Sequence, residues 1–224
     1  MYEKFFKRFI DFSLSFTALI LLSPILLVFT IIGAFVMKGN PFFVQPRPGK
    51  IGKDGKEKIF KLMKFRSMSN AKDKEGNLLP DDVRLSKYGR FLRKTSIDEL
   101  PSLFNIVIGD LAICGPRPLL VEYLPYYTEE ERTRHNVRPG LTGWAQVNGR
   151  NALDWEKRFQ YDVYYVQHIS LKFDIKIIFM TVSAVVNRKG VQDNPQIEEG
   201  NMAHIRAGKA NEQMERNHKE MEVR

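Results

Sequence analysis

Two adjacent carboxylates, Asp98 and Glu99, are the side chains in this sequence with the clearest capacity for chemistry. Neighbouring carboxylates can share a hard cation such as Mg²⁺, which prefers oxygen ligands and keeps substrate phosphates in its shell. A carboxylate can also attack phosphorus and form an acyl-phosphate intermediate. The same residues fit a structural role, because Ser96 followed by Glu99 has the spacing of a helix capping box. The spacing by itself leaves the catalytic and the capping interpretations open.

Basic side chains are concentrated beside glycine, proline and other turn residues in five short stretches. Arginine on a rigid turn suits phosphate, because its planar group donates two parallel hydrogen bonds to one anion. Any single stretch could be solvated surface charge, but their number in a small chain favours a substrate that carries phosphate. The stretches are residues 64–66, 93–101, 115–118, 138–140 and 149–151.

The charge of the chain favours an anionic partner. Its 224 residues have a formal net charge of +9, and residues 191–224 hold seven acidic against five basic side chains, so the rest of the chain carries the positive charge. A basic body suits an anionic membrane leaflet, a nucleotide or a phospholipid. The sequence has no recognised nucleic-acid-binding motif, so we expect no nucleic acid partner. Cys114 is the single cysteine and the four histidines lack the spacing of metal ligands, which excludes a disulfide framework and a Cys/His metal cluster.

The N-terminal region contains an uncharged apolar run from Phe12 to Met37, with Ser23-Pro24 in its middle. The run is 26 residues long. A straight helix of that length, at about 1.5 Å per residue, would cross a hydrocarbon core of roughly 30 Å. A proline inside a helix removes a backbone hydrogen bond, and here it splits the run into halves that are each too short to span. The Ser23 side chain could satisfy a backbone group that Pro24 frees.

Basic residues flank the apolar run on both sides: Lys4, Lys7 and Arg8 precede it, and Lys38, Arg47, Lys50 and Lys53 follow it. Positive flanks mark the cytoplasmic side of a membrane. A re-entrant helix that bends at Ser23-Pro24 and returns satisfies both flanks, whereas a spanning helix satisfies one. A kinked transmembrane helix is the alternative, and a cleaved signal peptide is disfavoured because the run is long and no small-x-small site follows it.

We divide the chain into a re-entrant membrane hairpin at residues 1–37, a cytoplasmic catalytic domain at residues 38–190 and a charged tail at residues 191–224. The expected fold is mostly α with a small β element (α+β), with amphipathic interfacial helices. The tail has few large apolar residues and is expected to be a solvated helix or disordered. Extended segments are expected at residues 42–44 and 59–68, and helices at residues 83–94, 96–108, 119–134, 153–167 and 171–187.

The last of these predicted helices, residues 171–187, has a broad apolar arc with a polar side. Core packing explains such an arc, and so does a position in the lipid interface. The pattern leaves both interpretations open.

Several motifs occur together in the order in which one known family has them. The basic flank and the Ser-Pro-broken hairpin are followed by KFRSM at residues 64–68, SIDELPSLFN at 96–105, GPRP at 115–118 and RPGLTG at 138–143. In this combination the chain resembles the bacterial sugar transferases, the monotopic polyprenyl-phosphate phosphoglycosyl transferases, over residues 1–190. Residues 119–125 and 146–151 look most like those of the Campylobacter-type members, which begin protein N-glycosylation with diacetylbacillosamine phosphate.

The resemblance implies a ping-pong reaction at the cytoplasmic face of the inner membrane. Asp98 would attack the sugar-linked phosphate of a UDP-sugar, expected to be UDP-N,N'-diacetylbacillosamine. UMP would leave, and undecaprenyl phosphate would then take the phosphosugar. Asp98 and Glu99 would hold Mg²⁺. The residues that match positions around the family's phosphates and nucleotide are Lys64, Arg93, Arg117, Arg150 and Asp162.

The implied partners are the UDP-sugar donor, the polyprenyl phosphate acceptor, membrane lipid and downstream glycosyltransferases. Three alternatives stay open. A phosphoglycosyl transferase of polysaccharide synthesis would use another sugar. A plain glycosyltransferase would release UDP, although neither an Asp-x-Asp motif nor a nucleotide-binding α/β domain is evident. A membrane-surface adaptor would use its arginines for anionic lipid and Asp98-Glu99 only as a cap.

Overall fold

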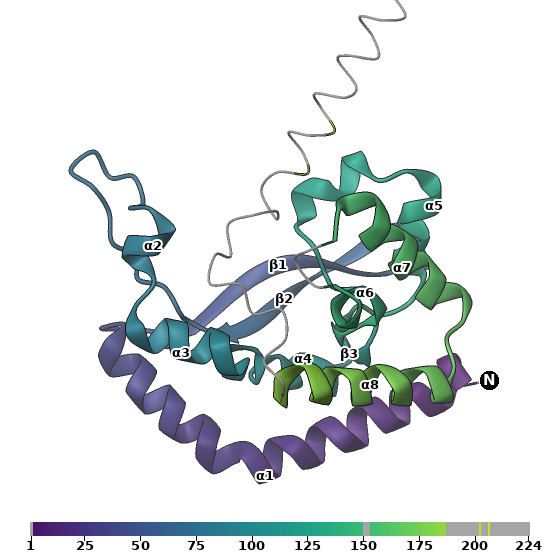
Figure 1. Cartoon of the computed structure of the whole chain (residues 1–224), viewed down its shortest axis with the longest axis horizontal. Coiled ribbons are helices and arrows are strands. Elements are labelled where there is room, and N and C mark those ends of the chain that lie inside the picture. The colour runs from purple at the N-terminus through teal and green to yellow at the C-terminus, as the bar shows by residue number, and fades with distance from the viewer. Residues whose placement is uncertain (1, 150–152, 187–201, 203–205, 207–224) are drawn as a thin grey trace, which may run out of the picture.

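A twisted β-hairpin forms the centre of the body that follows the N-terminal helix (Figure 1). Strand β1 runs from Phe42 to Ile51 and pairs antiparallel with strand β2, Glu57–Phe65. The strand predicted at residues 59–68 is confirmed over most of its length. The short extended piece predicted at residues 42–44 is the start of a longer strand, because pairing with β2 holds the following prolines and glycine extended.

The structure is a computed structural model, and it describes residues 2–149, 153–186, 202 and 206. A second sheet within it is very short: β3, Ala112–Cys114, lies parallel to β4, Gly140–Thr142. No strand is expected from the sequence in either segment, because runs of three residues are too short for periodicity to reveal one. Two small sheets among many helices confirm the α+β class.

Helices make up most of the remaining described chain. After the N-terminal helix they are α2 (Asp81–Arg84), α3 (Lys87–Thr95), α4 (Ser102–Ile108), α5 (Glu129–Arg132), α6 (Trp144–Val147), α7 (Trp155–Gln167) and α8 (Leu171–Val186). Short 3₁₀ segments lie at Ile97–Glu99, Val121–Tyr126 and Thr133–Asn136. The helices predicted at residues 153–167 and 171–187 are confirmed by α7 and α8.

Three other predicted helices are broken. In the segment 96–108, the 3₁₀ turn Ile97–Glu99 precedes α4, which begins only at Ser102 after Pro101. The segment 83–94 is interrupted at Leu85, because Ser86 is extended and its hydroxyl accepts the Gly89 N–H to cap α3. The segment 119–134 is interrupted by the 3₁₀ turn that contains Pro125, and α5 begins only at a new capping box. In the segments 83–94 and 119–134, local caps therefore end one helix and begin another, where the apolar pattern predicts a single helix.

Three clusters of buried side chains hold the body together. The first packs β2 onto α4, the second packs the 3₁₀ segment Val121–Tyr126 onto α7, and the third packs β3 against α7 and α8. The first fixes the start of α4 near the end of β2. The buried members are Phe60, Leu62, Leu103, Ile106 and Leu111; Leu119, Tyr123, Trp155, Phe159 and Met202; and Cys114, Val137, Tyr165 and Ile177.

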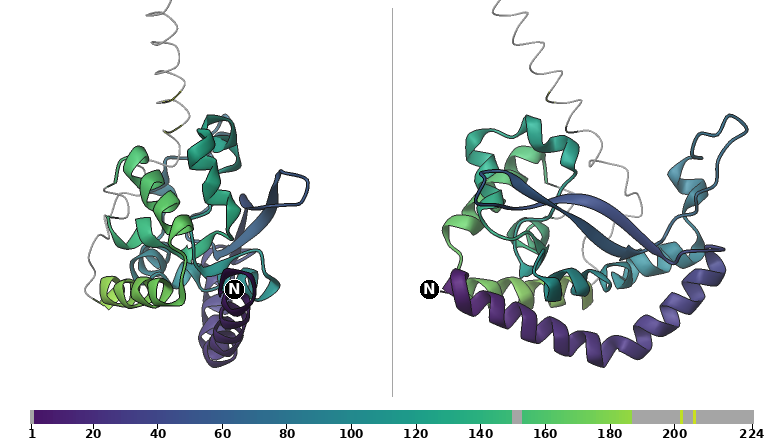
Figure 2. Two further views of the ribbon diagram at one scale, coloured as in Figure 1. Left: turned by 90° about the vertical axis from the view of Figure 1, so that its right-hand side faces the viewer. Right: turned by 180° about the vertical axis from the view of Figure 1, so that it is seen from behind.

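Helix α1 runs from Lys7 to Val36 with Pro24 inside it, after a π-helical turn at Tyr2–Phe6. Figures 1 and 2 show that it bends near its middle and that both of its ends lie against the body. The Ser23 hydroxyl donates to the carbonyl of Ile20 at 2.8 Å. That carbonyl would otherwise accept the N–H that proline lacks. The break predicted at Ser23-Pro24 is therefore a bend within one continuous helix, kept by a substitute hydrogen bond.

Both halves of α1 are bonded to the body. Arg8 in the first half donates to the carbonyls of Ile106 and Val107, at 2.5 and 2.6 Å, where α4 ends. In the second half, the carbonyl of Phe29 accepts the hydroxyl of Tyr88 in α3 at 2.9 Å. Helix α1 thus holds the two helices that flank Asp98 and Glu99 in sequence.

An exposed apolar surface extends along α1 and α8. Helix α8 runs along the N-terminal half of α1 (Figures 1 and 2), and Lys7 meets Asp174 between them. Among the described helices, α1 alone is long and apolar enough to cross a membrane. Helix α8 buries Ile177 in the core and exposes other apolar side chains. Core packing is therefore confirmed for one side of its arc, and the interfacial interpretation stays a prediction for the other side. Large exposed apolar residues include Phe9, Phe16, Leu21, Leu27 and Phe35 on α1, and Leu171, Ile175, Phe179, Val182 and Val185 on α8.

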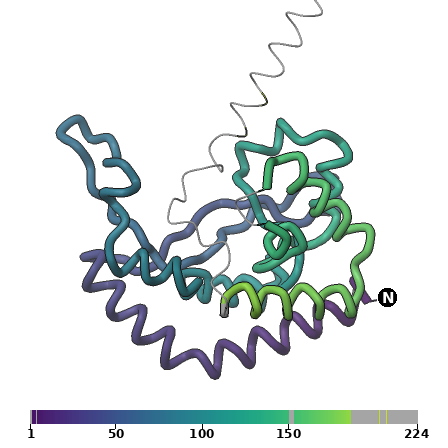
Figure 3. The backbone as a smooth tube through the Cα atoms, in the orientation of Figure 1, coloured from purple at the N-terminus to yellow at the C-terminus, as the bar shows by residue number. Residues whose placement is uncertain are grey.

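The segment between β2 and α3 projects from the body as a narrow loop with α2 at its base (Figure 3). A bridge between Lys72 and Leu78 pairs its two sides. The loop contacts the body where the Gly89 backbone of α3 packs against Ser67. A Cβ at Gly89 would lie 1.8 Å from the Ser67 carbonyl oxygen.

The predicted tail, residues 191–224, lies outside the described residues except for Met202 and Arg206. Met202 is buried in the second cluster. Arg206 forms an ion pair with Glu131 at 2.6 Å and donates to the carbonyl of Tyr126 at 2.6 Å. At these two positions the expectation of a solvated tail is wrong, because both side chains pack on the body.

Candidate active site

Asp98 and Glu99 lie in the 3₁₀ turn Ile97–Glu99, between α3 and α4. Ser96 ends α3 in the left-handed conformation, with φ 57° and ψ 18°. An N-cap residue needs an extended backbone, and the Ser96 side chain makes no capping bond. The capping-box interpretation is therefore wrong. A left-handed residue other than glycine is costly and often marks a functional turn.

Glu99 is held by two cations from distant parts of the chain. Its Oε1 atom accepts Lys64 Nζ at 2.8 Å and Arg117 Nη1 at 3.3 Å. Burial works to raise the pKa of Glu99, but the charges and hydrogen bonds of Lys64 and Arg117 outweigh it and lower the pKa to about 2. Glu99 is thus a fixed, ionised carboxylate.

Asp98 has a different environment. No hydrogen bond or ion pair joins its carboxylate to another residue in the described part of the chain. Burial, followed by the negative charge of Glu99, raises the pKa of Asp98 to about 6, against the opposing charges of Lys64, Arg93 and Arg117. A carboxylate with a raised pKa is more basic, and one without a bonded partner is not restrained. Asp98 has both properties, which are those of an available nucleophile.

The three predicted cations that act on Asp98 come from three elements. Lys64 lies near the end of β2, Arg93 in the last turn of α3 and Arg117 after β3. The Arg93 head group is oriented by Ser67, whose Oγ accepts its Nε–H at 3.0 Å. The structure therefore brings Lys64, Arg93 and Arg117 together around the carboxylates, and their binding of phosphate stays a prediction.

Glycine contacts place the turn that carries Arg117. Gly115 N–H donates to the carbonyl of Thr142 and Gly140 N–H donates to the carbonyl of Pro116, both at 2.9 Å. A Cβ at Gly140 would lie 2.1 Å from the nitrogen of Gly115, so a side chain there would push the two segments apart. The motifs at residues 115–118 and 138–143, separate in sequence, are thus one packed unit.

Asp162 lies behind this unit and is 1% exposed. Its Oδ2 accepts Arg134 Nη2 at 2.7 Å and Arg134 Nε at 3.1 Å. Arg134 Nη2 also donates to the main-chain carbonyl of Arg117 at 2.7 Å. Asp162 therefore contributes to the site indirectly. It bonds to Arg134, and Arg134 holds the backbone of Arg117.

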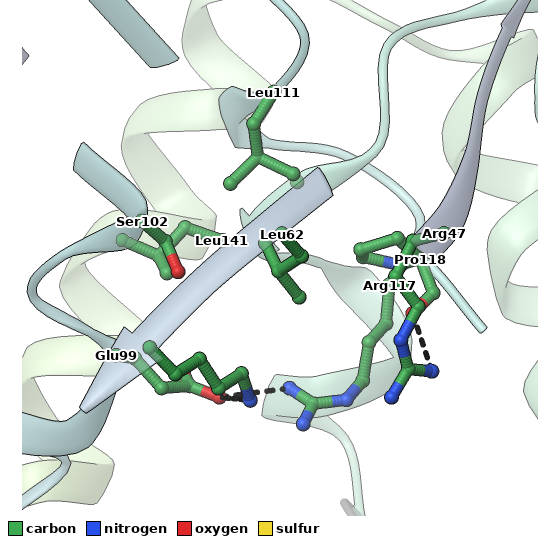
Figure 4. Close-up of a pocket in the computed structure, with 10 residues that line it drawn as sticks. Arg47, Leu62, Glu99, Ser102, Leu111, Arg117, Pro118 and Leu141 are labelled. Atoms are coloured by element: carbon green, nitrogen blue, oxygen red, sulfur yellow. Dashed lines mark hydrogen bonds and ion pairs between the residues drawn. The ribbon is translucent and has the colours of Figure 1, made fainter. Parts of the chain in front are cut away.

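A pocket opens beside Glu99, with a volume of about 20 Å³. Figure 4 shows the head groups of Arg47 and Arg117 at one end of it, with Leu111 and Ser102 away from them. The sequence marks Arg47 only as a membrane-flanking charge, and nothing local distinguishes it from the lysines nearby. The lining residues are Arg47, Leu62, Lys64, Glu99, Ser102, Leu111, Arg117, Pro118, Gly140 and Leu141.

The other candidate groups are Arg150, a bound cation and Cys114. Arg150 lies outside the described residues. The described residues contain no group of three or more metal-ligating side chains, so a cation at this site would have the adjacent carboxylates of Asp98 and Glu99 as its candidate protein ligands. Burial raises the pKa of Cys114, which keeps the thiol protonated. Among the described residues, the site thus combines one restrained carboxylate, one unrestrained carboxylate and more cations than carboxylates, which suits attack on a phosphate ester.

A family model described as bacterial sugar transferase matches residues 2–188. The chain is 50% identical over 192 residues to the uncharacterized sugar transferase EpsL of Bacillus subtilis, covering 85% of this chain and 92% of that protein. It is 43% identical over 187 residues to the UDP-glucose:undecaprenyl-phosphate glucose-1-phosphate transferase of Klebsiella pneumoniae, covering 79% of this chain.

A third relative, at 33% identity over 196 residues and 84% of this chain, is the UDP-N-acetylgalactosamine-undecaprenyl-phosphate N-acetylgalactosaminephosphotransferase of Aeromonas hydrophila. The Klebsiella and Aeromonas proteins are longer, and the chain spans 39% and 45% of their lengths. Their names specify different sugars on the same lipid carrier.

Proposed function

We propose that this chain, which belongs to the bacterial sugar transferase family, transfers a sugar 1-phosphate from a UDP-sugar to polyprenyl phosphate and releases UMP. The contrast between the two carboxylates carries the proposal: Glu99 is bound by Lys64 and Arg117, whereas Asp98 is unbonded among the described residues and has a raised pKa. The names of the relatives support the same reaction class.

The proposed mechanism has two steps. In the first, a carboxylate oxygen of Asp98 attacks the sugar-linked phosphorus, the bridging P–O bond breaks, and its electron pair leaves with UMP. In the second, an oxygen of polyprenyl phosphate attacks the same phosphorus and displaces Asp98. Lys64, Arg93, Arg117 and, by its match to the family, Arg150 oppose the negative charge that would repel an attacking carboxylate.

Mg²⁺ is the proposed cofactor, and the residues present fit it. This cation is usually held by one or two carboxylates together with substrate phosphates. Both hydrogen bonds that Glu99 makes with described residues go to Oε1, so Oε2 and the Asp98 carboxylate can supply its protein oxygens. When bound, Mg²⁺ would neutralise phosphate charge.

We propose that α1 enters one leaflet and returns, with the catalytic domain on the cytoplasmic face of the inner membrane. The bend, the Ser23–Ile20 hydrogen bond and the bonds of both halves of α1 to the same body support this. The exposed apolar side of α8 supports an interfacial position beside it. A membrane-level site would meet the acceptor phosphate without extracting the lipid, and would pass its product to downstream glycosyltransferases.

The donor remains open between family members. UDP-N,N'-diacetylbacillosamine, with a role in protein glycosylation, is our first proposal from the sequence motifs, while the relatives are named for glucose and N-acetylgalactosamine. A UDP-releasing glycosyltransferase is the mechanistic alternative. It needs no covalent intermediate, and it gives no reason for the Asp98 carboxylate to stay unbonded while Lys64 and Arg117 bind Glu99 beside it.

The test is the identity of the released nucleotide. Purified protein with Mg²⁺ and polyprenyl phosphate is given UDP-glucose, UDP-galactose, UDP-N-acetylgalactosamine and UDP-N,N'-diacetylbacillosamine in turn, and nucleotides are separated by chromatography. We expect UMP, and an intact mass increased by one phosphosugar when acceptor is omitted. Asp98→Asn should abolish the adduct, whereas Asp110→Asn, a carboxylate paired with exposed Lys58, should not. Release of UDP would refute phosphosugar transfer.

A further inference from the structure

Among the described residues that line the pocket beside Glu99, basic side chains outnumber acidic ones. Three cationic side chains line it, Arg47, Lys64 and Arg117, against the single carboxylate of Glu99. Two of them bond to Glu99. Arg47 enters from β1, on the other side of Arg117 (Figure 4). A pocket with this balance is built for an anion.

Arg47 follows the apolar run in the sequence, but it is not a solvated surface charge. It is 6% exposed and its head group is fixed. Nη1 donates to the carbonyl of Pro118 at 3.1 Å and Nη2 donates to Oε1 of Gln45 at 2.7 Å. A buried guanidinium held in one orientation has already lost its rotamer freedom, so little further entropy is lost when it binds a ligand. Its bond to Pro118 also ties it to the residue that follows Arg117.

The order of the cationic side chains along the site indicates which phosphate of the donor lies beside each of them. Lys64, Arg93 and Arg117 act on Asp98, so the phosphorus that Asp98 attacks lies among them. Arg117 also borders Arg47 through Pro118. The second phosphate of a nucleoside diphosphate is one bridging oxygen away from the first, and the Arg47 end of the pocket is the next cationic position along the rim (Figure 4).

We propose that Arg47 binds the nucleotide-side phosphate of the donor and stabilises the charge that develops on the departing UMP; this inference rests on the proposed function. As the bond from Asp98 to the sugar-linked phosphorus forms, the bridging P–O bond breaks and its electron pair stays on the UMP oxygen. The UMP phosphate gains a negative charge in that step. A preoriented guanidinium beside that oxygen binds the transition state more strongly than the bound donor.

The experiment compares Arg47→Gln and Arg47→Lys with wild type. Inhibition constants for UMP and for uridine are measured against the donor, and the rate of UMP release is measured at saturating donor. Lys61→Gln is the matched control, because Lys61 is an exposed cation on β2, three residues before Lys64. Melting temperatures identify variants that fail to fold, and Arg47→Lys keeps the charge if Arg47→Gln does not fold.

Loss of a charge-assisted bond predicts that UMP inhibition weakens about 10- to 100-fold in Arg47→Gln and less in Arg47→Lys. Uridine inhibition should change less than about twofold, as should both constants in Lys61→Gln. The rate of UMP release should fall in parallel with UMP binding.

Equal weakening for uridine and UMP would assign Arg47 a structural role at Pro118 and overturn the inference, as would no change for either. In both cases wild-type protein would still release UMP, which leaves the proposed function intact. If wild-type protein releases no UMP from any donor, the proposed function fails and the role of Arg47 fails with it.

Discussion

Two charged clusters of similar composition differ in what surrounds them, one in the turn before α4 and the other between α1 and α8. The first holds Asp98 and Glu99 with Lys64 and Arg117. The second joins Lys7, Asp11 and Asp174, with Lys7 Nζ 2.7 Å from Asp174 Oδ2 and 3.6 Å from Asp11 Oδ2. The second cluster is closed: side chains of its members are 4–6% exposed, whereas those of Lys64, Glu99 and Arg117 are 21–35% exposed.

In the closed cluster, the charged groups bond to one another and to neighbouring polar groups. Asp174 Oδ1 accepts the Tyr165 hydroxyl at 2.7 Å, and Asp11 Oδ1 accepts the Ile113 N–H at 3.2 Å. These bonds join α1, α7, α8 and β3 at one point. The open cluster instead has more cations than its carboxylates bind and leaves Asp98 unbonded among the described residues. Charge balance and access, rather than residue type, therefore separate the proposed catalytic carboxylates from those of the closed cluster.

The largest expected effect is on activity, from Asp98→Asn. Removing a nucleophile should lower UMP release by at least about 10³-fold. Stability should not fall: the folded-state pKa of Asp98, about 6, is above the ordinary 3.8, so above pH 6 the ionised carboxylate opposes folding and the neutral amide does not. Melting at pH 8 checks this. Retained UMP release in a folded variant would remove Asp98 from the mechanism.

An Asp→Asn substitution in the closed cluster should instead lower stability and leave activity unchanged. Asp174→Asn leaves Lys7 buried with only the more distant Asp11, and breaking such a pair costs about 3 kcal/mol or more. Denaturant unfolding in detergent measures it, and activity per folded molecule should be retained. Asp110→Asn, whose partner Lys58 is 71% exposed, should cost at most about 1 kcal/mol. Equal losses in both variants would contradict the distinction between closed and open clusters.

An intermediate effect is expected on pH dependence. Only the ionised form of Asp98 can attack, so the first-step rate should fall about tenfold per pH unit below its midpoint, and the raised pKa puts that midpoint near 6 in the unliganded site. Lys64 lowers the pKa of Asp98, so Lys64→Gln should move the midpoint of kcat/KM to higher pH. Lys61→Gln serves as the control and should leave it in place. A shift to lower pH in Lys64→Gln would show that Asp98 is not the titrating group.

The smallest effect concerns the anchor. Ser23→Ala removes the hydrogen bond to the Ile20 carbonyl, and hydrogen bonds within membranes contribute about 0.6 kcal/mol on average. We expect a slight loss of stability with the bend retained, because Pro24 and the contacts of Arg8 and Tyr88 remain. Labelling of cysteines introduced at both ends of α1 reports their sides of the membrane. Ends on opposite sides in wild type would refute the re-entrant proposal.

Prediction from sequence succeeded where local pattern and motif order carry the information. The hairpin strand, α7, α8 and the gathering of Lys64, Arg93 and Arg117 around Asp98 follow from it. It failed at Ser96, where the capping spacing is present but the backbone is left-handed. It also failed to separate Arg47 from other flanking cations. Both failures concern long-range contacts: Glu99 is drawn to Lys64 and Arg117, and Arg47 to Pro118.

The sequence by itself determined which groups are present: a carboxylate pair, turn-borne arginines and an apolar segment interrupted by proline. Those follow from residue type and spacing. Only the tertiary structure decided that Glu99 is restrained while Asp98 is not, that Asp162 acts through Arg134, and that α1 bends without breaking. The reason is that a carboxylate's pKa and availability depend on the charges within a few ångströms, and the fold brings those charges from β1, β2, α3 and the turn after β3.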